Sequence, residues 1–194
     1  MIDKFSILKE YKTWMLQYSG GIDSTLLLYY LNKIRTNQEW WIGTGVNNNE
    51  TIYNRHALDV IDVLGIDNVY HVLYPQTHIT GEEKHKMDKA FHMRMLPHLD
   101  PKTSIVIQGR NKNPDHHIAG EDIIRNGGSP ELSTELGFTV FRPWANMNKK
   151  EIVECYRKEG IINLINYTRS CVSLTEDECG KCFWCKEKAW GMEV

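Results

Sequence analysis

A short run of glycine, hydroxyl and acidic residues near the N-terminus is the part of the sequence best suited to chemistry. The run is Ser19-Gly20-Gly21-Ile22-Asp23-Ser24-Thr25, and it follows a segment of strand character, Thr13–Tyr18. In α/β proteins, a strand followed by a glycine turn and a helix start binds phosphate, because backbone N–H groups and the helix N-terminus face the anion. Ser24 and Thr25 add hydroxyl donors, and the Asp23 carboxylate can hold a Mg²⁺ ion that bridges phosphate oxygens.

This run differs from the two commonest phosphate-binding motifs. It lacks the Gly-Lys-Ser/Thr ending of a Walker loop and the G-x-G-x-x-G spacing of a dinucleotide fold. It resembles instead the pyrophosphate loop, Ser-Gly-Gly-x-Asp-Ser, of the N-type ATP pyrophosphatases. We therefore expect ATP phosphates and Mg²⁺ to be held by Ser19, Gly20, Gly21, Ile22, Asp23, Ser24 and Thr25.

Four of the five cysteines crowd into residues 171–185 and form a second candidate site. They are Cys171, Cys179, Cys182 and Cys185, so two overlapping C-x-x-C steps follow a cysteine eight residues upstream. Four thiolates suit tetrahedral Zn²⁺, which is structural because no coordination position stays open for water. An iron–sulfur cluster is the alternative, since C-x-x-C-x-x-C also begins the ferredoxin run, although no Cys-Pro ending follows here. Cys155 is expected to be a small buried residue of a helix.

Composition limits the classes of protein to which the chain can belong. With 194 residues, 41% of them hydrophobic, and a net charge of −2, the chain suits one soluble domain and makes a nucleic-acid partner improbable. Its first residues carry no leader pattern, and no apolar run approaches the roughly 18 residues of a membrane span. An odd number of cysteines also argues against a disulfide framework. We therefore expect a cytoplasmic protein without a membrane partner.

Strand-like and helical segments alternate along the chain. The expected strands are Thr13–Tyr18, Trp40–Thr44, Val69–Leu73, Ser104–Gln108 and Phe138–Phe141. The expected helices are Asp3–Lys12, about Ser24–Arg35, a second around Ala57–Leu64, about Glu82–Leu96, and one that Asn148 caps with Glu151 in a near capping box. This alternation predicts an α/β fold, a doubly wound, mostly parallel five-stranded sheet with a C-terminal zinc-binding segment.

The predicted organisation places the candidate residues at one edge of the sheet. Residues 1–166 are expected to form a nucleotide-binding domain, and residues 167–194 a zinc-binding segment packed on it. Ligands of such sheets bind beyond the carboxyl ends of the strands, where the loops after the first and fourth strands meet. The glycine-rich region Gly120–Gly137 is expected to be a loop that covers the site.

Several motifs together resemble the 7-cyano-7-deazaguanine synthase family, from Trp14 to Ala189. The matching segments are Ser19–Thr25, Tyr53-Asn54-Arg55-His56, Arg142-Pro143, Asn148-Lys149-Lys150-Glu151-Ile152, Ser170-Cys171 and Cys179–Cys185. The phosphate loop alone is also found in argininosuccinate synthases, GMP synthases and tRNA thiolases. Its combination with the cysteines is much more specific.

The resemblance implies the adenine nucleotide alpha hydrolase-like fold and a ligase reaction. ATP would activate the carboxylate of 7-carboxy-7-deazaguanine as its acyl-adenylate, ammonia would give the amide, and a second ATP would dehydrate the amide to the nitrile. The resemblance further implies Mg²⁺, Zn²⁺ and a homodimer. Asp23 and Ser24 would act at the phosphates, with Lys149 and Arg110 as candidate cations beside the departing pyrophosphate.

The sequence departs from the family in the segment that shapes the deazaguanine pocket. The family has a Tyr-Pro-Asp-Cys-Arg-like run there, whereas this chain has Gly109–Asp115 without a cysteine. The acceptor acid is therefore less well defined than the use of ATP. Two other functions stay open: an RNA base thiolase with an iron–sulfur cluster, and a non-catalytic relative that binds a nucleotide without releasing pyrophosphate.

Overall fold

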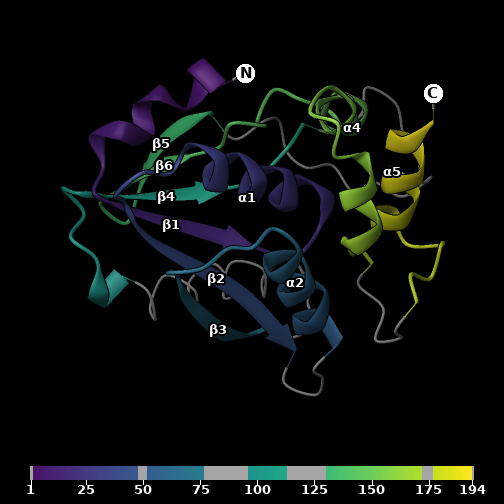
Figure 1. Cartoon of the computed structure of the whole chain (residues 1–194), viewed down its shortest axis with the longest axis horizontal. Coiled ribbons are helices and arrows are strands. Elements are labelled where there is room, and N and C mark those ends of the chain that lie inside the picture. Colours follow the sequence, from purple (N-terminus) through teal and green to yellow (C-terminus); the bar gives the residue numbers. More distant parts are fainter. Residues whose placement is uncertain (1, 48–51, 77–95, 113–129, 172–176, 194) are drawn as a thin grey trace.

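A six-stranded sheet forms the centre of the protein (Figure 1). The computed structural model describes residues 2–47, 52–76, 96–112, 130–171 and 177–193. The strands are β1 Thr13–Tyr18, β2 Glu39–Asn47, β3 Tyr70–Gln76, β4 Ser104–Gln108, β5 Leu132–Glu135 and β6 Phe138–Phe141, in the order β3-β2-β1-β4-β6-β5. All pairs are parallel except β5 with β6.

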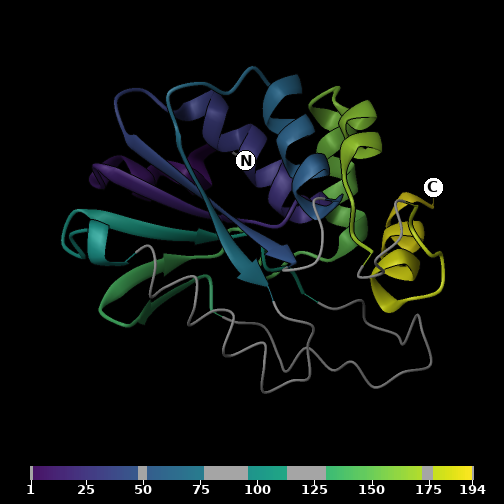
Figure 2. The same cartoon turned by 90° about the horizontal axis from the view of Figure 1, so that it is seen from below.

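The longer helices gather on one face of this sheet. The described helices are η1 Ile2–Glu10, α1 Ile22–Ile34, α2 Ile52–Val63, η2 Leu96–His98, α4 Lys149–Lys158, η3 Ile162–Tyr167 and α5 Phe183–Met192. Figure 2 shows α1, α2 and α4 on the same side of the strands. Helix α5 packs against α4, on the side toward which the central strands point. Among the described residues, none of the helices combines the length and hydropathy that crossing a bilayer requires.

The strand order makes the sheet doubly wound, as predicted. The chain runs outward from β1 to β2 and β3, and then returns to β4 and β6 on the other side of β1. In the register of the sheet, Leu16 of β1 lies between Ile42 of β2 and Ile107 of β4. The loops that follow β1 and β4 therefore leave the same edge at the switch point, where such sheets bind ligands.

The sheet has one strand more than the five expected, because β5 pairs with β6 in a hairpin. Its two-residue turn, Leu136 and Gly137, has positive φ at both positions (51° and 84°), which is the geometry of a type I′ turn. Such turns favour asparagine, aspartate or glycine, so Leu136 gives no sequence signal for a hairpin. The described part of the expected covering loop 120–137 thus contains a short edge strand.

Strand and helix ends differ from the expectation in ways that local chemistry explains. Strand β3 continues through Pro75, which a sheet tolerates because β3 lies at its edge. Helix α1 begins at Ile22, two residues early, because extended Gly21 is its N-cap. Gly65 (φ 59°) follows α2 at the expected helix end. The helix expected at about Glu82–Leu96 lies almost wholly outside the described residues.

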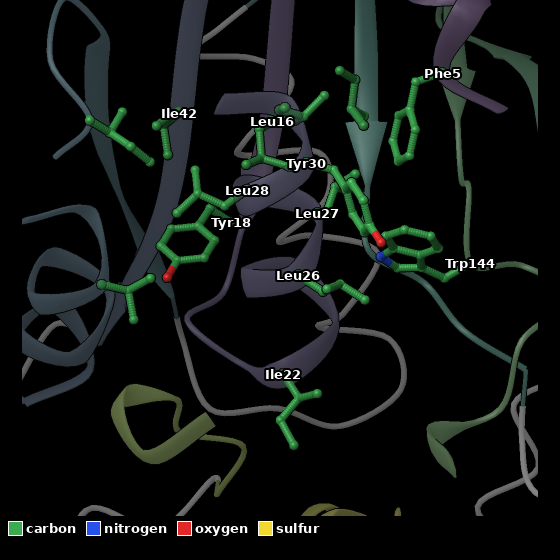
Figure 3. Packing of buried hydrophobic residues seen from close by; sticks show 14 of the residues in the cluster. Phe5, Leu16, Tyr18, Ile22, Leu26, Leu27, Leu28, Tyr30, Ile42 and Trp144 are labelled. Carbon is green, nitrogen blue, oxygen red and sulfur yellow. The ribbon is translucent and has the colours of Figure 1, made fainter. Parts of the chain in front are cut away.

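The main core lies between the sheet and α1. Figure 3 shows α1 residues such as Leu27 and Tyr30 packed toward Leu16 and Ile42 of the strands. The middle of α1, residues 26–31, is entirely apolar, and α4 packs against the helix as well as the sheet. A smaller cluster on the opposite face contains Met15, Leu99, Val106, Phe138 and Val140. The sheet and α4 thus enclose helix α1, and this packing fixes the position of its N-terminus.

Helix α4 starts with the capping box that the sequence predicts. The Asn148 side chain accepts a hydrogen bond from the Glu151 backbone N–H (3.1 Å), and the Glu151 carboxylate accepts one from the Asn148 N–H (2.8 Å). Together they satisfy two otherwise unpaired donors of the first turn, which carries Lys149.

We predict that Asn148→Ala lowers the free energy of unfolding by about 1 kcal/mol, because it removes this cap. Urea unfolding would measure the loss. Asn148→Asp keeps an oxygen acceptor and should retain most of the stability, and Glu154→Ala on the exposed side of α4 serves as a control. An alanine variant as stable as the parent protein would contradict the role of the cap.

Candidate functional site

The turn between β1 and α1 places Ser19, Gly20 and Gly21 at the N-terminus of α1, as predicted. Gly20 has φ +73°, in the left-handed region that favours glycine, and a Cβ there would lie 3.4 Å from Cβ of Ala57 on α2. The Gly20 carbonyl accepts a hydrogen bond from the Arg169 backbone N–H (2.9 Å). The turn is thus held against α2 and against a segment from the far end of the chain.

The two serines of the turn bond to each other across the helix start. Ser24 Oγ lies 3.0 Å from Ser19 Oγ, donates to the Gly21 carbonyl (3.1 Å) and accepts from the Ser19 N–H (3.3 Å). These bonds close the turn and bring two hydroxyl groups together at a helix N-terminus, the kind of place that binds anions.

Thr25 and Ile22 are directed into the core rather than toward the turn. The Thr25 hydroxyl lies 3.2 Å from the Tyr18 hydroxyl, and both side chains are fully buried. Ile22 is also buried in the main core. Of the seven predicted phosphate-binding residues, these two contribute to the site through the helix backbone and its packing.

Two aromatic side chains fix the first turn of α1. The Tyr156 hydroxyl donates to the Ile22 carbonyl (2.7 Å), and Trp144 Nε1 donates to the Asp23 carbonyl (3.0 Å). Burial raises the pKa of Tyr156 well above its usual value, so the phenol keeps the proton that it donates. The backbone at Asp23 is therefore held from outside the helix.

The loop after β4 touches the start of α1, as the doubly wound topology predicts. A Cβ at Gly109 would lie 2.9 Å from both Cα and N of Ser24, so the two backbones are in direct contact. The next residues are Arg110 and Asn111, and the Lys112 N–H donates to the Met147 carbonyl (2.8 Å) just before α4. Arg110 thus follows directly on the residue that contacts the phosphate loop. The remainder of the acceptor segment, from Asn113, lies outside the described residues.

Lys149 and Asp23, two predicted site residues 126 positions apart, form an ion pair in which Lys149 is buried and the Asp23 side chain is 19% exposed. Lys149 Nζ lies 2.5 Å from Asp23 Oδ2 and 3.5 Å from Glu187 Oε2 on α5. The Lys149 and Glu187 side chains are only 3% and 1% exposed. Asp23 Oδ1 is buried and has no hydrogen-bond partner. This arrangement leaves one buried carboxylate oxygen without a hydrogen bond at the start of α1.

Residues 168–171 connect the phosphate loop to the cysteines. A Cβ at Gly21 would lie 3.6 Å from the Arg169 carbonyl oxygen and from Ser170 Oγ. Arg169 is buried, and Cys171 follows two residues later. The Lys188 ammonium on α5 donates to the Thr168 carbonyl (2.9 Å) and so ties this segment to the C-terminal helix.

Four cysteine thiols converge, as the sequence predicts. The Sγ atoms of Cys171, Cys179, Cys182 and Cys185 all lie within 4.8 Å of one another. The separations include 3.4 Å for Cys182–Cys185 and 4.0 Å for Cys179–Cys185. A single ion with metal–sulfur bonds of about 2.3 Å holds four sulfurs about 3.8 Å apart in a tetrahedron. The thiols therefore fit one metal ion, and Cys155 is buried separately on α4, as expected.

Backbone amides surround the thiols. The Cys182 N–H donates to Cys179 Sγ (3.4 Å), and the Cys179 N–H donates to Cys171 Sγ (3.3 Å). Hydrogen bonds from the Lys181 and Cys182 backbones lower the pKa of the Cys179 thiol. Burial instead raises the pKa of the Cys185 thiol. Amide donors of this kind favour thiolate, which is the form that binds metal.

Sequence reasoning missed Gly109, Arg169 and Glu187. Gly109 and Arg169 stand beside predicted features, after a strand and before Cys171, but only the tertiary contacts show their use. Glu187, two residues after Cys185, carried the best available signal. Acidic residues are however also common on exposed helix faces, so the position of Glu187 in the sequence did not by itself indicate a site.

Comparison with known proteins supports the fold. Neither a scan against protein-family models nor a search of curated proteins gave a match. Among solved structures, NMN synthetase from Francisella tularensis aligns with a TM-score of 0.56 and 15% identity over 100% of this chain and 83% of its own. The U34-tRNA thiolase NcsA from Methanococcus maripaludis with its [4Fe-4S] cluster aligns with a TM-score of 0.52 and 12% identity, over 94% of this chain and 65% of its own.

A third structure is the phosphoadenylyl-sulfate reductase from Candida auris in a phosphate complex. It has a TM-score of 0.49 and 11% identity over 82% of this chain and 78% of its own. The two alignments with TM-scores above 0.5 and the strand order show that the chain has a mostly parallel α/β fold of the adenine nucleotide alpha hydrolase-like type. Its cysteine cluster is placed to bind a metal ion.

We predict that Gly109→Ala lowers the free energy of unfolding by about 1–3 kcal/mol, because its methyl group would meet the Ser24 backbone, which has no rotamer to change. Gly21→Ala is the matched control, since a methyl group there meets only ordinary contacts of 3.5 Å or more. Urea unfolding of both variants measures the difference. Equal losses would show that the loop after β4 does not press on α1.

Proposed function

We propose that the protein is an ATP-dependent ligase that adenylates the carboxylate of 7-carboxy-7-deazaguanine or a close relative. The observation that carries the proposal is the contact between two sequence motifs, the glycine–serine turn and the cysteine segment. A glycine–serine turn at the start of α1, with an available Asp23 oxygen, is bonded to the segment that leads into a four-thiol site. These are the two features on which the family resemblance rests.

The proposed reaction has two halves. The acid's carboxylate oxygen attacks the α-phosphorus of ATP, the α–β bond breaks, and pyrophosphate leaves. Ammonia then attacks the acyl carbon, and AMP leaves with the former carboxylate oxygen, giving the amide. A second ATP adenylates the amide oxygen, which departs with AMP as the nitrogen loses its protons and the nitrile forms.

The turn supplies what this chemistry needs at the departing pyrophosphate. Backbone amides at the start of α1 and the hydroxyls of Ser19 and Ser24 would receive phosphate oxygens. The free Oδ1 of Asp23 is a hard oxygen ligand suited to Mg²⁺, which would supply charge neutralisation when bound. Arg110, next to Gly109, would provide further positive charge, and Lys149, paired to Asp23, would orient the Asp23 carboxylate.

Zn²⁺ fits the four thiols better than an iron–sulfur cluster does. In a four-iron cluster each cysteine thiolate binds a different iron. The four cysteine sulfurs therefore lie farther apart than four sulfurs that bind one metal ion. Here they converge as for one ion. Four cysteines would leave Zn²⁺ no open position, and its contribution would be to hold the C-terminal segment in place.

A base thiolase is the second candidate, because the structural neighbour from Methanococcus maripaludis is a tRNA thiolase with a [4Fe-4S] cluster. The net charge of −2 argues against it, since phosphate contacts dominate RNA binding. A non-catalytic nucleotide-binding relative is the third. It would bind ATP and release no pyrophosphate.

The direct test is incubation with ATP, Mg²⁺, ammonia and 7-carboxy-7-deazaguanine, with product masses and AMP followed. We expect amide and nitrile from the wild-type protein, and turnover lowered roughly 100-fold in Asp23→Asn. Asp62→Asn, on the exposed side of α2, should leave turnover unchanged. If another acid is adenylated while this one gives no product, the substrate is wrong and the use of ATP stands. If no acid yields AMP, the ligase proposal fails.

We predict that Cys182→Ser loses bound metal and at least about 3 kcal/mol of stability together, because the four thiols fasten the C-terminal segment. Cys155→Ser is the control: this buried thiol donates to the Glu151 carbonyl, a bond that a hydroxyl can also make. Metal analysis and thermal unfolding provide the measurements. A colourless protein with one zinc per chain supports the assignment, whereas a brown anaerobic preparation with iron and sulfide would favour the thiolase.

A further inference from the structure

Glu187 lies on α5 where the C-terminal helix packs against α4 and the loop after β4. Its carboxylate reaches two elements: Oε2 is 3.5 Å from Lys149 Nζ on α4, and Oε1 accepts from Asn111 Nδ2 (3.4 Å) in the loop after β4. With 1% of its side chain exposed, Glu187 is a fully buried acid. Buried acids are rare unless they are paired, and this one is paired within the candidate site.

The next turn of α5 reinforces this contact. Gly191, four residues after Glu187, lies on the same helix face, and a Cβ there would come within 2.4 Å of Lys149 Cγ. The backbone of α5 therefore packs directly on the aliphatic part of Lys149. Helix α5 thus contacts the aliphatic part of Lys149 through Gly191 and the ammonium group of Lys149 through Glu187.

The charges on these residues do not balance within the triad. Lys149 is a single ammonium between two carboxylates, Asp23 at 2.5 Å and Glu187 at 3.5 Å. The Glu187 carboxylate offsets part of the positive charge of the Lys149 ammonium. The electrostatic potential at Asp23 is therefore more negative than it would be if Lys149 had Asp23 as its one acidic neighbour. A more negative Asp23 attracts a divalent cation more strongly, and its Oδ1 is the free oxygen.

We infer that Glu187 is a positioning residue for the phosphate site. It places a second negative charge beside the Asp23–Lys149 pair and thereby raises the affinity of Asp23 for Mg²⁺. This inference rests on the proposed function, in which Asp23 binds Mg²⁺ with ATP.

The test measures binding rather than turnover, with the non-cleavable analogue α,β-methylene-ATP titrated by calorimetry at a series of Mg²⁺ concentrations. Glu187→Gln keeps the shape and removes the charge, so the Mg²⁺ concentration for half-maximal binding should rise about tenfold, as for lost outer-shell ligands. Glu193→Gln is the matched control, because Glu193 directly follows α5 and pairs with Lys150 at the surface. It should leave that concentration unchanged.

Two further variants keep the inference open to refutation if the glutamine variant folds poorly. Glu187→Asp retains the charge and should require less Mg²⁺ than Glu187→Gln. Gly191→Ala retains Glu187 but displaces Lys149, and should change the Mg²⁺ requirement while the bound metal stays in place. Thermal unfolding and metal analysis accompany each variant, since a purely structural defect lowers stability without moving the Mg²⁺ midpoint.

The outcomes separate the inference from the proposed function. If the analogue binds and Glu187→Gln leaves the Mg²⁺ midpoint at the wild-type value, Glu187 is structural and the ligase proposal stands. A shift of equal size in Glu193→Gln overturns the inference in favour of a general surface-charge effect. If the wild-type protein binds no Mg²⁺–nucleotide at all, the proposed function is wrong and the inference falls with it.

Discussion

The partly buried ion pair between Asp23 and Lys149 joins helices α1 and α4. Asp23 lies in the first turn of α1, and Lys149 in the first turn of α4 beneath α5. Removing one partner of a buried pair commonly costs about 3–5 kcal/mol, yet replacing both by apolar residues is often neutral. Stability alone therefore gives little reason to keep such a pair. A site that must hold a carboxylate and a cation at a fixed separation gives a better one.

The ion pair depends on a helix start that cannot move. Helix α1 is buried between the sheet and α4, and the Tyr156 hydroxyl and Trp144 indole hold its first carbonyls from outside. Phosphate recognition by backbone amides requires this kind of fixed geometry, because the amides contribute only if their directions are set before the ligand arrives. The large apolar core thus serves the site by fixing the N-terminus of α1.

Sequence patterns predicted the features that depend on the types and spacing of residues close together in the chain. The strand before Ser19, the capping box at Asn148 and the convergence of four cysteines all depend on spacing along the chain, and all are present. The β5–β6 hairpin was missed because Leu136 occupies a turn position that usually carries asparagine, aspartate or glycine. Gly109, Arg169 and Glu187 were missed for another reason. Their partners lie tens of residues away or more, and no periodicity encodes such a contact.

The cysteine segment contacts the elements that form the proposed phosphate site. Arg169 donates its backbone N–H to Gly20 two residues before Cys171, and Glu187 reaches Lys149 two residues after Cys185. Both ends of the metal-binding segment thus contact residues that position the phosphate loop. A metal ion that draws the four thiols together shortens the path between these two contacts and restricts their motion. One segment thus carries the four thiols and the contacts with the turn before α1 and with Lys149, so the stability of the thiol site and the position of that turn are linked through the same residues.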